Sequence, residues 1–289
     1  MEGGPSPELH IEGRFKSFDG TELYEQAWRP KRDPKAAIVL IHGICEHSGR
    51  YTETASFLMG RGYAVETFDL RGHGRSGGIR CYVEEFDEYL EDLDVFLARV
   101  MERQPQKPIF LFGHSMGGGI ALRHVIFRRP SLRGLMLSAP SVLIGESVAP
   151  LLRRISGILS RLLPKLPAAG IDTSALSRDP AVLERRDEDP HVFQGKIPAR
   201  TGAELLRICG GILERMSEIT LPMLLMHGNA DRLADPEGSR RLYQGVGSGD
   251  KTLRLYDGLY HEILNEPEKE KVLNDLAEWV DAHIRSGDR

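Results

Sequence analysis

The 289-residue sequence predicts an α/β fold in which a mostly parallel central sheet is covered by helices on both faces. Short segments that are apolar throughout alternate with longer segments of amphipathic helical spacing, which is typical of parallel strands buried between helices. Glycine-rich, polar and titratable residues follow several of the apolar segments directly. Ligands of open parallel sheets bind beyond the carboxyl ends of the strands, so these residues indicate a functional site at one edge of the sheet.

The first half of the chain predicts a hairpin followed by a regular strand–helix alternation. Residues 8–30 alternate apolar and polar side chains around a turn at 18–21, as a hairpin does. Apolar strands are then expected over residues 36–41, 64–68, 109–112 and 134–138, with helices over 52–60, 83–103 and 120–128 between them.

After residue 140 this alternation stops, and it resumes only with strands at 222–227 and 252–256 and a terminal helix over 267–284. The intervening segment has helical patterns of its own and is too long for a plain loop. We therefore expect a core formed by residues 1–141 and 216–289, with an inserted helical cap over 142–215.

Composition excludes several classes of protein. The net charge of −4 and a pI near 6.2 give no basic footprint for nucleic acid. The N-terminus lacks the basic and apolar regions of a signal peptide, and no apolar run approaches the roughly 20 residues of a membrane span. Three widely spaced cysteines, Cys45, Cys81 and Cys209, form no metal-ligand pattern and are interpreted as reduced thiols of a cytoplasmic protein. Oligomeric state is left open.

Residues 109–120, Ile-Phe-Leu-Phe-Gly-His-Ser-Met-Gly-Gly-Gly-Ile, contain a Gly-x-Ser-x-Gly pentapeptide centred on Ser115. An apolar strand segment precedes it and helical spacing follows it. A sharp strand-to-helix turn of this kind exposes the central side chain, and the two flanking glycines leave room for it. Residues 74–78 fit the same pattern around Ser76, but no apolar strand precedes them, so Ser76 is interpreted as a loop serine.

A serine hydroxyl needs a base within hydrogen-bond reach, and with this type of turn the chain order is nucleophile, acid, histidine. His261 follows the last strand through a turn and can reach the sheet edge, whereas His283 lies in the polar half of the terminal helix and is expected to be solvated. His261 is therefore the candidate base. Asp231 is the candidate acid, because Asp235 has the position of a helix cap and Asp257 that of a turn residue.

Two backbone N–H groups are expected to form an oxyanion hole. One is that of Met116, directly after the nucleophile, and the other is that of Ile44, in the loop after the first parallel strand. Each such donor is typically worth about 3–4 kcal/mol in the transition state. Because the chain supplies the nucleophile, base and donors, acyl transfer through an acyl-enzyme needs no metal or organic cofactor. Three other histidines are expected to fix loops by hydrogen bonds: His42, His73 and His114.

With these residues placed, the chain resembles the α/β-hydrolase superfamily, and within it the monoacylglycerol lipase and lysophospholipase group. The resemblance covers essentially the whole core. It rests on residues 42–51, 69–76, 113–118 and 228–231 and on His261, and the loop containing Glu-His-Ser-Gly-Arg-Tyr at 46–51 is its most specific part. The resemblance implies an α/β-hydrolase fold and hydrolysis of a single-chain glycerol ester. Ile44 and Cys45 stand where small residues are more usual, so a narrower pocket is expected there.

The resemblance also implies that Glu46 and Arg50 hydrogen-bond the polar head of the substrate; alternatively, they pair with each other and hold the loop. In the cap, apolar residues at helical spacing are interleaved with basic ones. Such a segment can rest transiently on an anionic membrane surface, making the protein peripheral, or can simply close the active site. The apolar members are Val148, Leu151, Leu152, Ile155, Ile158, Leu159, Leu162 and Leu163, and the basic members are Arg153, Arg154, Arg161 and Lys165.

The sequence thus predicts a serine carboxylic-ester hydrolase acting on monoacylglycerols, lysophospholipids or other short lipid esters. An aminopeptidase, a cofactor-free haloperoxidase or a general carboxylesterase would share the same three catalytic side chains. A peptidase needs acidic cap groups for the substrate amine, and the candidates are Glu184, Asp187, Glu188 and Asp189. A binding protein on an inactive scaffold is a further alternative, and the complete set of catalytic side chains argues against it.

Overall fold

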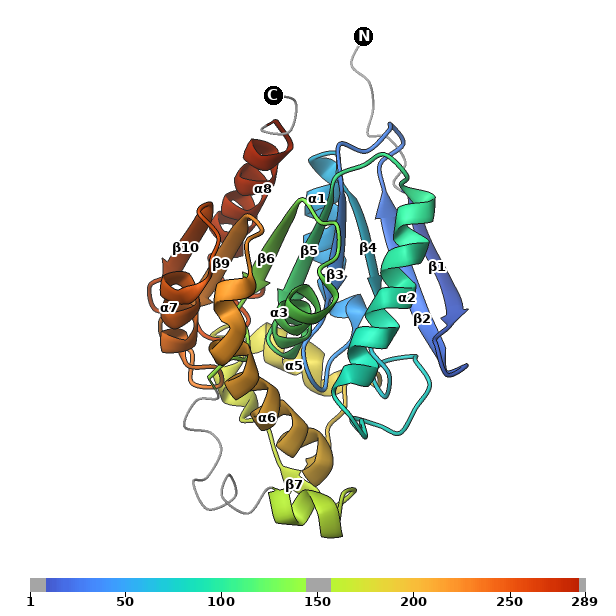
Figure 1. Cartoon of the computed structure of the whole chain (residues 1–289), viewed down its shortest axis with the longest axis vertical. Coiled ribbons are helices and arrows are strands. Elements are labelled where there is room, and N and C mark those ends of the chain that lie inside the picture. The colour runs from blue at the N-terminus through green and yellow to red at the C-terminus, as the bar shows by residue number, and fades with distance from the viewer. Residues whose placement is uncertain (1–8, 144–156, 286–289) are drawn as a thin grey trace.

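The computed structural model describes residues 9–143 and 157–285, and an eight-stranded sheet forms its middle layer (Figure 1). The strand order is β1-β2-β4-β3-β5-β6-β9-β10. The strands are β1 (Leu9–Lys16), β2 (Glu22–Arg29), β3 (Ala37–Ile41), β4 (Ala64–Phe68), β5 (Ile109–His114), β6 (Gly134–Ser138), β9 (Met223–Gly228) and β10 (Lys251–Tyr256). The six strands from β4 to β10 in this order pair in parallel, which confirms the predicted fold class.

The N-terminal hairpin is confirmed and extends the parallel sheet at one edge. β1 pairs antiparallel with β2 from Leu9 opposite Arg29 to Lys16 opposite Glu22. β2 in turn pairs antiparallel with β4, and six of its eight residues are buried. The hairpin is therefore an integral part of the sheet and not a separate ribbon.

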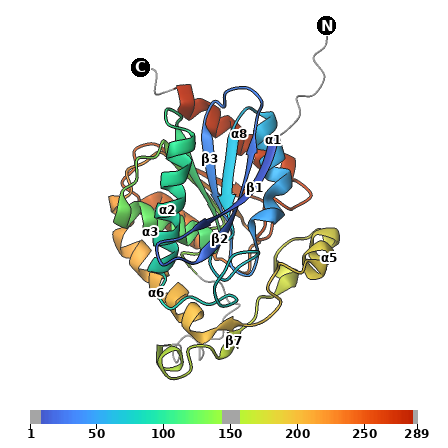
Figure 2. The ribbon, with the colours of Figure 1, turned by 90° about the vertical axis from the view of Figure 1, so that its right-hand side faces the viewer.

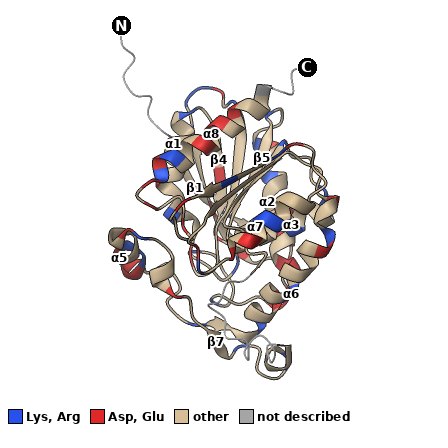
Figure 3. Cartoon of the chain, turned by 90° about the vertical axis from the view of Figure 1, so that its left-hand side faces the viewer, with Lys and Arg blue, Asp and Glu red and all other residues tan. Residues whose placement is uncertain are grey.

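The sheet separates two apolar cores, which is why its central strands are apolar throughout. Val39 on β3 packs in the core shared with α2 (Asp87–Arg103), α3 (Met116–Arg128), α6 (Ala199–Arg215) and α7 (Pro236–Gly245). Its neighbours Ile38 and Leu40 pack on the other face, with α1 (Thr52–Gly60) and α8 (Lys269–Arg285). Figure 3 shows that charged residues of both signs occur along the outer helices.

Two helices begin more than two residues away from their predicted starts. α3 begins at Met116, directly after the candidate nucleophile and not at residue 120. α2 begins at Asp87, so the predicted start at residue 83 is wrong. The backbone N–H groups of Val83 and Phe86 donate to side chains on α6, Thr201 at 3.2 Å and Glu204 at 3.0 Å. These long-range hydrogen bonds hold residues 83–86 out of the helix. The spacing of apolar residues in the local sequence does not indicate them.

Between β6 and β9 the chain leaves the sheet. The described elements are a helical segment at 157–162, β7 (Pro167–Ala169), η2 (Thr173–Ala175), α5 (Pro180–Glu188), β8 (Ile197–Pro198), α6 and η3 (Met216–Glu218). β7 and β8 form a small antiparallel pair. Figures 1 and 2 show α5 and β7 on the side of the sheet opposite the chain termini, which is where the parallel strands end.

Part of the predicted basic amphipathic segment lies outside the described residues, namely Val148, Leu151, Leu152, Ile155, Arg153 and Arg154. Across residues 9–143 and 157–285, none of the helices combines the length and the apolar character that crossing a bilayer requires.

Candidate active site

Ser115 stands at the turn between β5 and α3, in a backbone conformation that few non-glycine residues adopt. Its φ of 52° and ψ of −118° lie in a strained region. Three backbone hydrogen bonds hold it there. Its N–H donates to the carbonyl of Ser138 at 2.9 Å, and its own carbonyl accepts from Gly119 at 3.2 Å and from Ser141 at 3.0 Å. The predicted strand–turn–helix arrangement around this serine is confirmed.

The two motif glycines make this turn possible. A Cβ atom at position 117 would lie 2.3 Å from the carbonyl oxygen of Ile41, at the end of β3. A Cβ atom at position 113 would lie 2.5 Å from the carbonyl oxygen of Gly117. Both distances are far inside van der Waals contact with backbone atoms, so these positions require glycine, as the motif predicted.

Asp231 follows β9, and its carboxylate is buried within a complete set of hydrogen bonds. Nδ1 of His261 donates to Oδ2 at 2.7 Å. Oδ1 accepts from the backbone N–H groups of Leu233 at 2.8 Å and Ala234 at 3.1 Å. Nε2 of a second histidine, His227, lies 3.0 Å from Oδ2. The sequence did not single out the role of His227, although this residue lies near the end of β9, four residues before Asp231.

The charges of this pair stabilise each other. Burial alone would raise the pKa of Asp231, but attraction to His261 and the hydrogen bonds from His227 and His261 hold it well below its usual range. Burial by itself would lower the pKa of His261. The negative charge of Asp231, with smaller contributions from Glu262 and Glu46, outweighs this effect of burial and raises the pKa of His261 above its usual value. With Nδ1 bound to Asp231, Nε2 is the ring nitrogen that can accept a proton.

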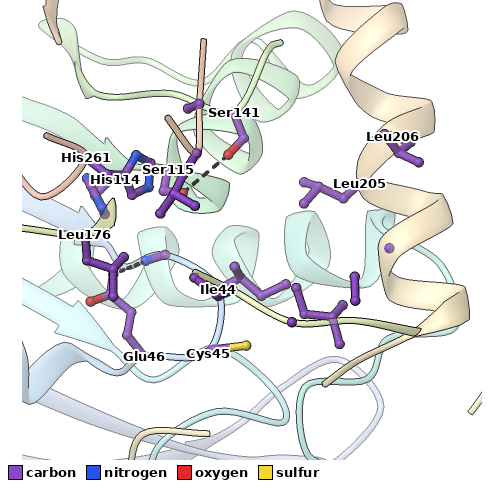
Figure 4. A pocket seen from close by; sticks show the side chains of 18 of the residues that line it. Ile44, Cys45, Glu46, His114, Ser115, Ser141, Leu176, Leu205, Leu206 and His261 are labelled. Atoms are coloured by element: carbon purple, nitrogen blue, oxygen red, sulfur yellow. Dashed lines mark hydrogen bonds between the residues drawn. The ribbon is translucent and has the colours of Figure 1, made fainter. Parts of the chain in front are cut away.

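Ser115 and His261 line the same cavity of about 140 Å³. Figure 4 shows Ser115 between Ser141 and the rings of His114 and His261. The hydroxyl of Ser115 hydrogen-bonds the hydroxyl of Ser141, with the oxygens 3.3 Å apart. Ser141 was not among the predicted site residues, although it lies only three residues beyond the end of β6, where the strand-end rule places functional groups.

The two predicted oxyanion donors belong to different segments, the loop after β3 and the start of α3. Ile44 belongs to the loop after β3 and lines the cavity. Met116 is the first residue of α3, and the first N–H groups of a helix have no partner within the helix. Their role as oxyanion donors stays a prediction.

Glu46 and Arg50 form an ion pair next to the cavity. Oε1 of Glu46 accepts from the N–H of Gly43 at 2.5 Å and the hydroxyl of Tyr51 at 2.7 Å, and Oε2 accepts from Arg50 at 2.8 Å. Burial would raise the pKa of Glu46, but the guanidinium of Arg50 outweighs it, and the pKa falls to about 2. Arg50 also donates both Nη groups to Glu262, each at 2.7 Å. Glu262 was not among the predicted site residues, and its position directly after His261 is the only sequence feature that points to it.

The structural histidines behave as expected. His42 accepts from the N–H of Leu70 at 2.9 Å, and Nδ1 of His73 lies 2.9 Å from the carbonyl of Arg71. His114 lies 3.1 Å from the hydroxyl of Ser138. Burial lowers the pKa of His42, lowers that of His73 to about 3, and lowers that of His114 to about 4. These rings are therefore neutral supports for the loops.

The discarded candidates also have structural roles. The hydroxyl of Ser76 donates to the carbonyl of Asp69, and Asp235 caps α7 by accepting from the N–H of Glu237 at 2.9 Å. Asp257 accepts from the side chain of Asn229 at 2.8 Å. His283 is not a solvated surface residue as expected: its ring stacks on Trp279, with the centroids 3.8 Å apart, and pairs with Asp250 at 3.0 Å.

Most of the large side chains that line the cavity are apolar, and the charged side chains in the same lining include Glu46, Arg50 and Glu262. The large apolar lining residues are Ile44, Leu159, Ile171, Leu176, Ile197, Leu205, Leu206 and Leu233. Such a cavity fits a ligand with one long apolar part and one polar part beside Ser115.

This sheet order, with a strained serine at the turn after β5, defines an α/β-hydrolase. The chain belongs to the family described as serine aminopeptidase, S33, whose profile matches residues 32–268.

The individual relatives and solved structures that match this chain include several lipases. The chain is 37% identical to a monoacylglycerol lipase of Mycolicibacterium smegmatis, covering 94% of this chain and 98% of that protein. It is 36% identical to human monoglyceride lipase, and the match covers 91% of this chain and 88% of that protein. The crystal structure of Paleococcus ferrophilus monoacylglycerol lipase matches with a TM-score of 0.80 and 32% identity, covering 90% of this chain and 99% of that one. The chain is a carboxylic-ester hydrolase.

Proposed function

We propose that this protein hydrolyses monoacylglycerols and related single-chain lipid esters through an acyl-enzyme on Ser115. The observation that carries the proposal is the shared cavity: a strained serine and a histidine bound to a buried carboxylate lie together beneath apolar cap residues. The similarity to monoacylglycerol lipases supports glycerol esters as the substrate class.

The reaction begins when the hydroxyl of Ser115 turns from Ser141 towards Nε2 of His261. His261 takes the proton as Oγ attacks the ester carbonyl, and the N–H groups of Ile44 and Met116 hold the oxyanion. The imidazolium, stabilised by Asp231, then gives its proton to the departing glycerol oxygen. Water deprotonated by His261 attacks the acyl-enzyme and releases the fatty acid.

The two ends of the substrate would meet different parts of the cavity. The acyl chain would lie along the apolar residues of the cap and core, and the glycerol would lie towards Glu46 and Arg50, which line the same cavity. The mutual pairing of these two side chains supports a loop-holding role, and their place in the lining leaves a glycerol hydroxyl within reach of the pair.

Apart from the description of the family, nothing in the described part of the site favours an aminopeptidase. Two of the acidic cap residues are paired elsewhere: Asp189 with His47 at 2.8 Å, and Asp187 with Arg186 at 3.0 Å. Within the described ranges, the acidic residues that line the cavity are Glu46 and Glu262, and both are bound to Arg50.

A substrate profile tests the proposal. We expect rapid hydrolysis of monooleoylglycerol, slower hydrolysis of ethyl oleate and of di- and trioleoylglycerol, and no cleavage of proline anilides. Ser115→Ala should lose all activity. In Glu46→Ala the preference for monooleoylglycerol over ethyl oleate should shrink if the pair contacts glycerol. Preferential cleavage of the anilide, or activity retained in Ser115→Ala, would contradict the proposal.

The cap also supports a proposed transient contact with membranes, which would make the protein peripheral. Ile158, Leu162 and Leu163 are 65%, 73% and 54% exposed, although Leu159 of the same segment lines the cavity. The basic residues Arg161 and Lys165 stand among them. Apolar side chains flanked by cations suit an anionic lipid surface.

Co-sedimentation at low salt tests this contact. We expect binding to vesicles containing phosphatidylglycerol, weaker binding to phosphatidylcholine alone, and loss of binding in Leu162→Glu. The matched control is Leu9→Glu, because Leu9 is 53% exposed on β1, away from the cap. Equal sedimentation of the wild type and Leu162→Glu would exclude this surface as the contact.

A further inference from the structure

Two of the three cysteines lie in direct contact, although they are widely separated in sequence. The Sγ atoms of Cys45 and Cys81 are 3.3 Å apart. Cys45 follows Ile44 in the loop after β3, and Cys81 lies in the loop between β4 and α2. Both side chains are buried, at 2% and 0% exposure. The sequence predicted three reduced, widely spaced thiols and gave no indication of this contact.

The backbone directs both thiols to the same point. Cys45 and Cys81 have φ values of 63° and 54°, which are unusual for residues other than glycine. The carbonyl of Cys45 accepts from the N–H of Phe193 at 3.0 Å, and the N–H of Cys81 donates to the carbonyl of Gly72 at 2.9 Å. Uncommon conformations persist where surrounding bonds determine them, and they concentrate at functional positions.

Only one thiol of the pair borders the cavities found in the described part of the chain. Cys45 lines both the cavity of Ser115 and a neighbouring cavity of about 110 Å³. Figure 4 shows its sulfur beside Ile44 and Glu46. The hydrogen bond with Cys45 and burial both raise the pKa of Cys81 well above its usual value, so this thiol stays protonated. A small oxidant entering through the cavity would therefore meet Cys45 first.

We propose that Cys45 and Cys81 form a reversible disulfide that acts on the loop after β3. With a peroxide as oxidant, the sulfur of Cys45 attacks a peroxide oxygen, giving a sulfenic acid and one water. The thiol of Cys81 then forms the sulfur–sulfur bond as the sulfur–oxygen bond of the sulfenic acid breaks, and its proton goes to the leaving oxygen, which departs as a second water. Two thiols and one hydrogen peroxide thus give one disulfide and two waters. A dithiol reductant reverses the change.

The disulfide would disturb catalysis because a sulfur–sulfur bond is about 2.05 Å long. Starting from 3.3 Å, the two sulfurs must approach by roughly 1.3 Å. That movement pulls on the residue between Ile44, the proposed oxyanion donor, and Glu46. The effect on rate rests on the proposed function, whereas formation of the disulfide does not.

Peptide mapping of the full-length protein tests the cross-link. Trypsin places the three cysteines in separate peptides, 36–50, 81–99 and 208–215. After treatment with diamide, which takes two electrons and two protons from two thiols, we expect a cross-link between 36–50 and 81–99, with 208–215 still open to alkylation. Cross-links to 208–215, or none under native conditions, would overturn the proposal whatever the activity.

The activity measurement tests the consequence. Diamide should lower kcat for monooleoylglycerol at least tenfold in the wild type with KM little changed, and dithiothreitol should restore it. Cys81→Ser should lose this sensitivity. Cys209→Ser, the matched control, should keep it, because Cys209 lies on α6 and its thiol donates to the carbonyl of Ser141. A cross-linked enzyme with unchanged kcat would overturn the proposed effect on the loop.

Discussion

Arg50 joins the two loops that carry the candidate catalytic groups. It binds Glu46, in the loop that contains Ile44, and Glu262, the residue directly after His261. The side chains of all three are at most 10% exposed. Removing one partner of a buried ion pair typically costs about 3–5 kcal/mol of stability. The ion pairs of Arg50 should therefore contribute strongly to the positions of both loops. Glu262 also places a negative charge beside His261.

Because of this charge, we expect the pH dependence of kcat/KM to change when Glu262 is replaced. His261 must be neutral to take the proton of Ser115, so kcat/KM falls as the pH drops through its pKa. The carboxylates of Asp231 and Glu262 favour the imidazolium and raise that pKa. In Glu262→Gln one of these charges is gone, and we expect the acid limb of kcat/KM to move to lower pH. The measurement is a pH–rate profile on a soluble short-chain glycerol ester.

The matched control is Glu268→Gln. Glu268 pairs with Arg178 and is 48% exposed, so its loss changes the net charge equally without acting on His261. The acid limb of this variant should coincide with that of the wild type. An acid limb that stayed in place or moved to higher pH in Glu262→Gln would show that Glu262 does not act on the base.

Among the elements, the turn from β5 into α3 decides whether Ser115 is presented at all. The helix approaches the end of β3 so closely that a methyl group at position 117 would collide with the carbonyl of Ile41. A carbonyl held in a strand ladder cannot move aside as a flexible side chain can. The strain at Ser115 therefore depends on this approach.

We expect Gly117→Ala to lower the free energy of unfolding by about 3 kcal/mol or more, at the upper end of overpacking effects, and to abolish activity. Urea unfolding provides the measurement. The matched control is Gly210→Ala on α6, where nothing lies within 4 Å of an added Cβ. That variant should gain up to about 1 kcal/mol, because alanine is the better helix former. Equal stability of the two variants would refute the steric argument.

How well each element could be predicted depends on what determines its ends. The strands at 64–68 and 134–138 and the helix at 52–60 match their predicted ranges, because local turn residues such as Gly62 separate them from the neighbouring elements. The start of α2 could not be predicted, since Thr201 and Glu204 hold the preceding residues from a distant helix.

Across the whole molecule, the parallel sheet brings the candidate site together. Ile44 follows β3, Ser115 follows β5, Asp231 follows β9 and His261 follows β10, so all four lie at one edge. The succession of strands along the chain and their polar ends could therefore be predicted from the sequence, whereas their order within the sheet was not. The contacts of Ser115 with Ser141, of Arg50 with Glu262, and of Cys45 with Cys81 could not, because they depend on loop paths and side-chain directions and have no periodicity.

Labelling with a fluorophosphonate tests the central claim that Ser115 is the nucleophile activated by His261. We expect one adduct per chain on tryptic peptide 104–123, which contains Ser115, and none on 76–80, which contains Ser76. His261→Ala should slow labelling by about 10²-fold or more, the usual contribution of a general base. Labelling at another serine, or an undiminished rate in His261→Ala, would contradict the account.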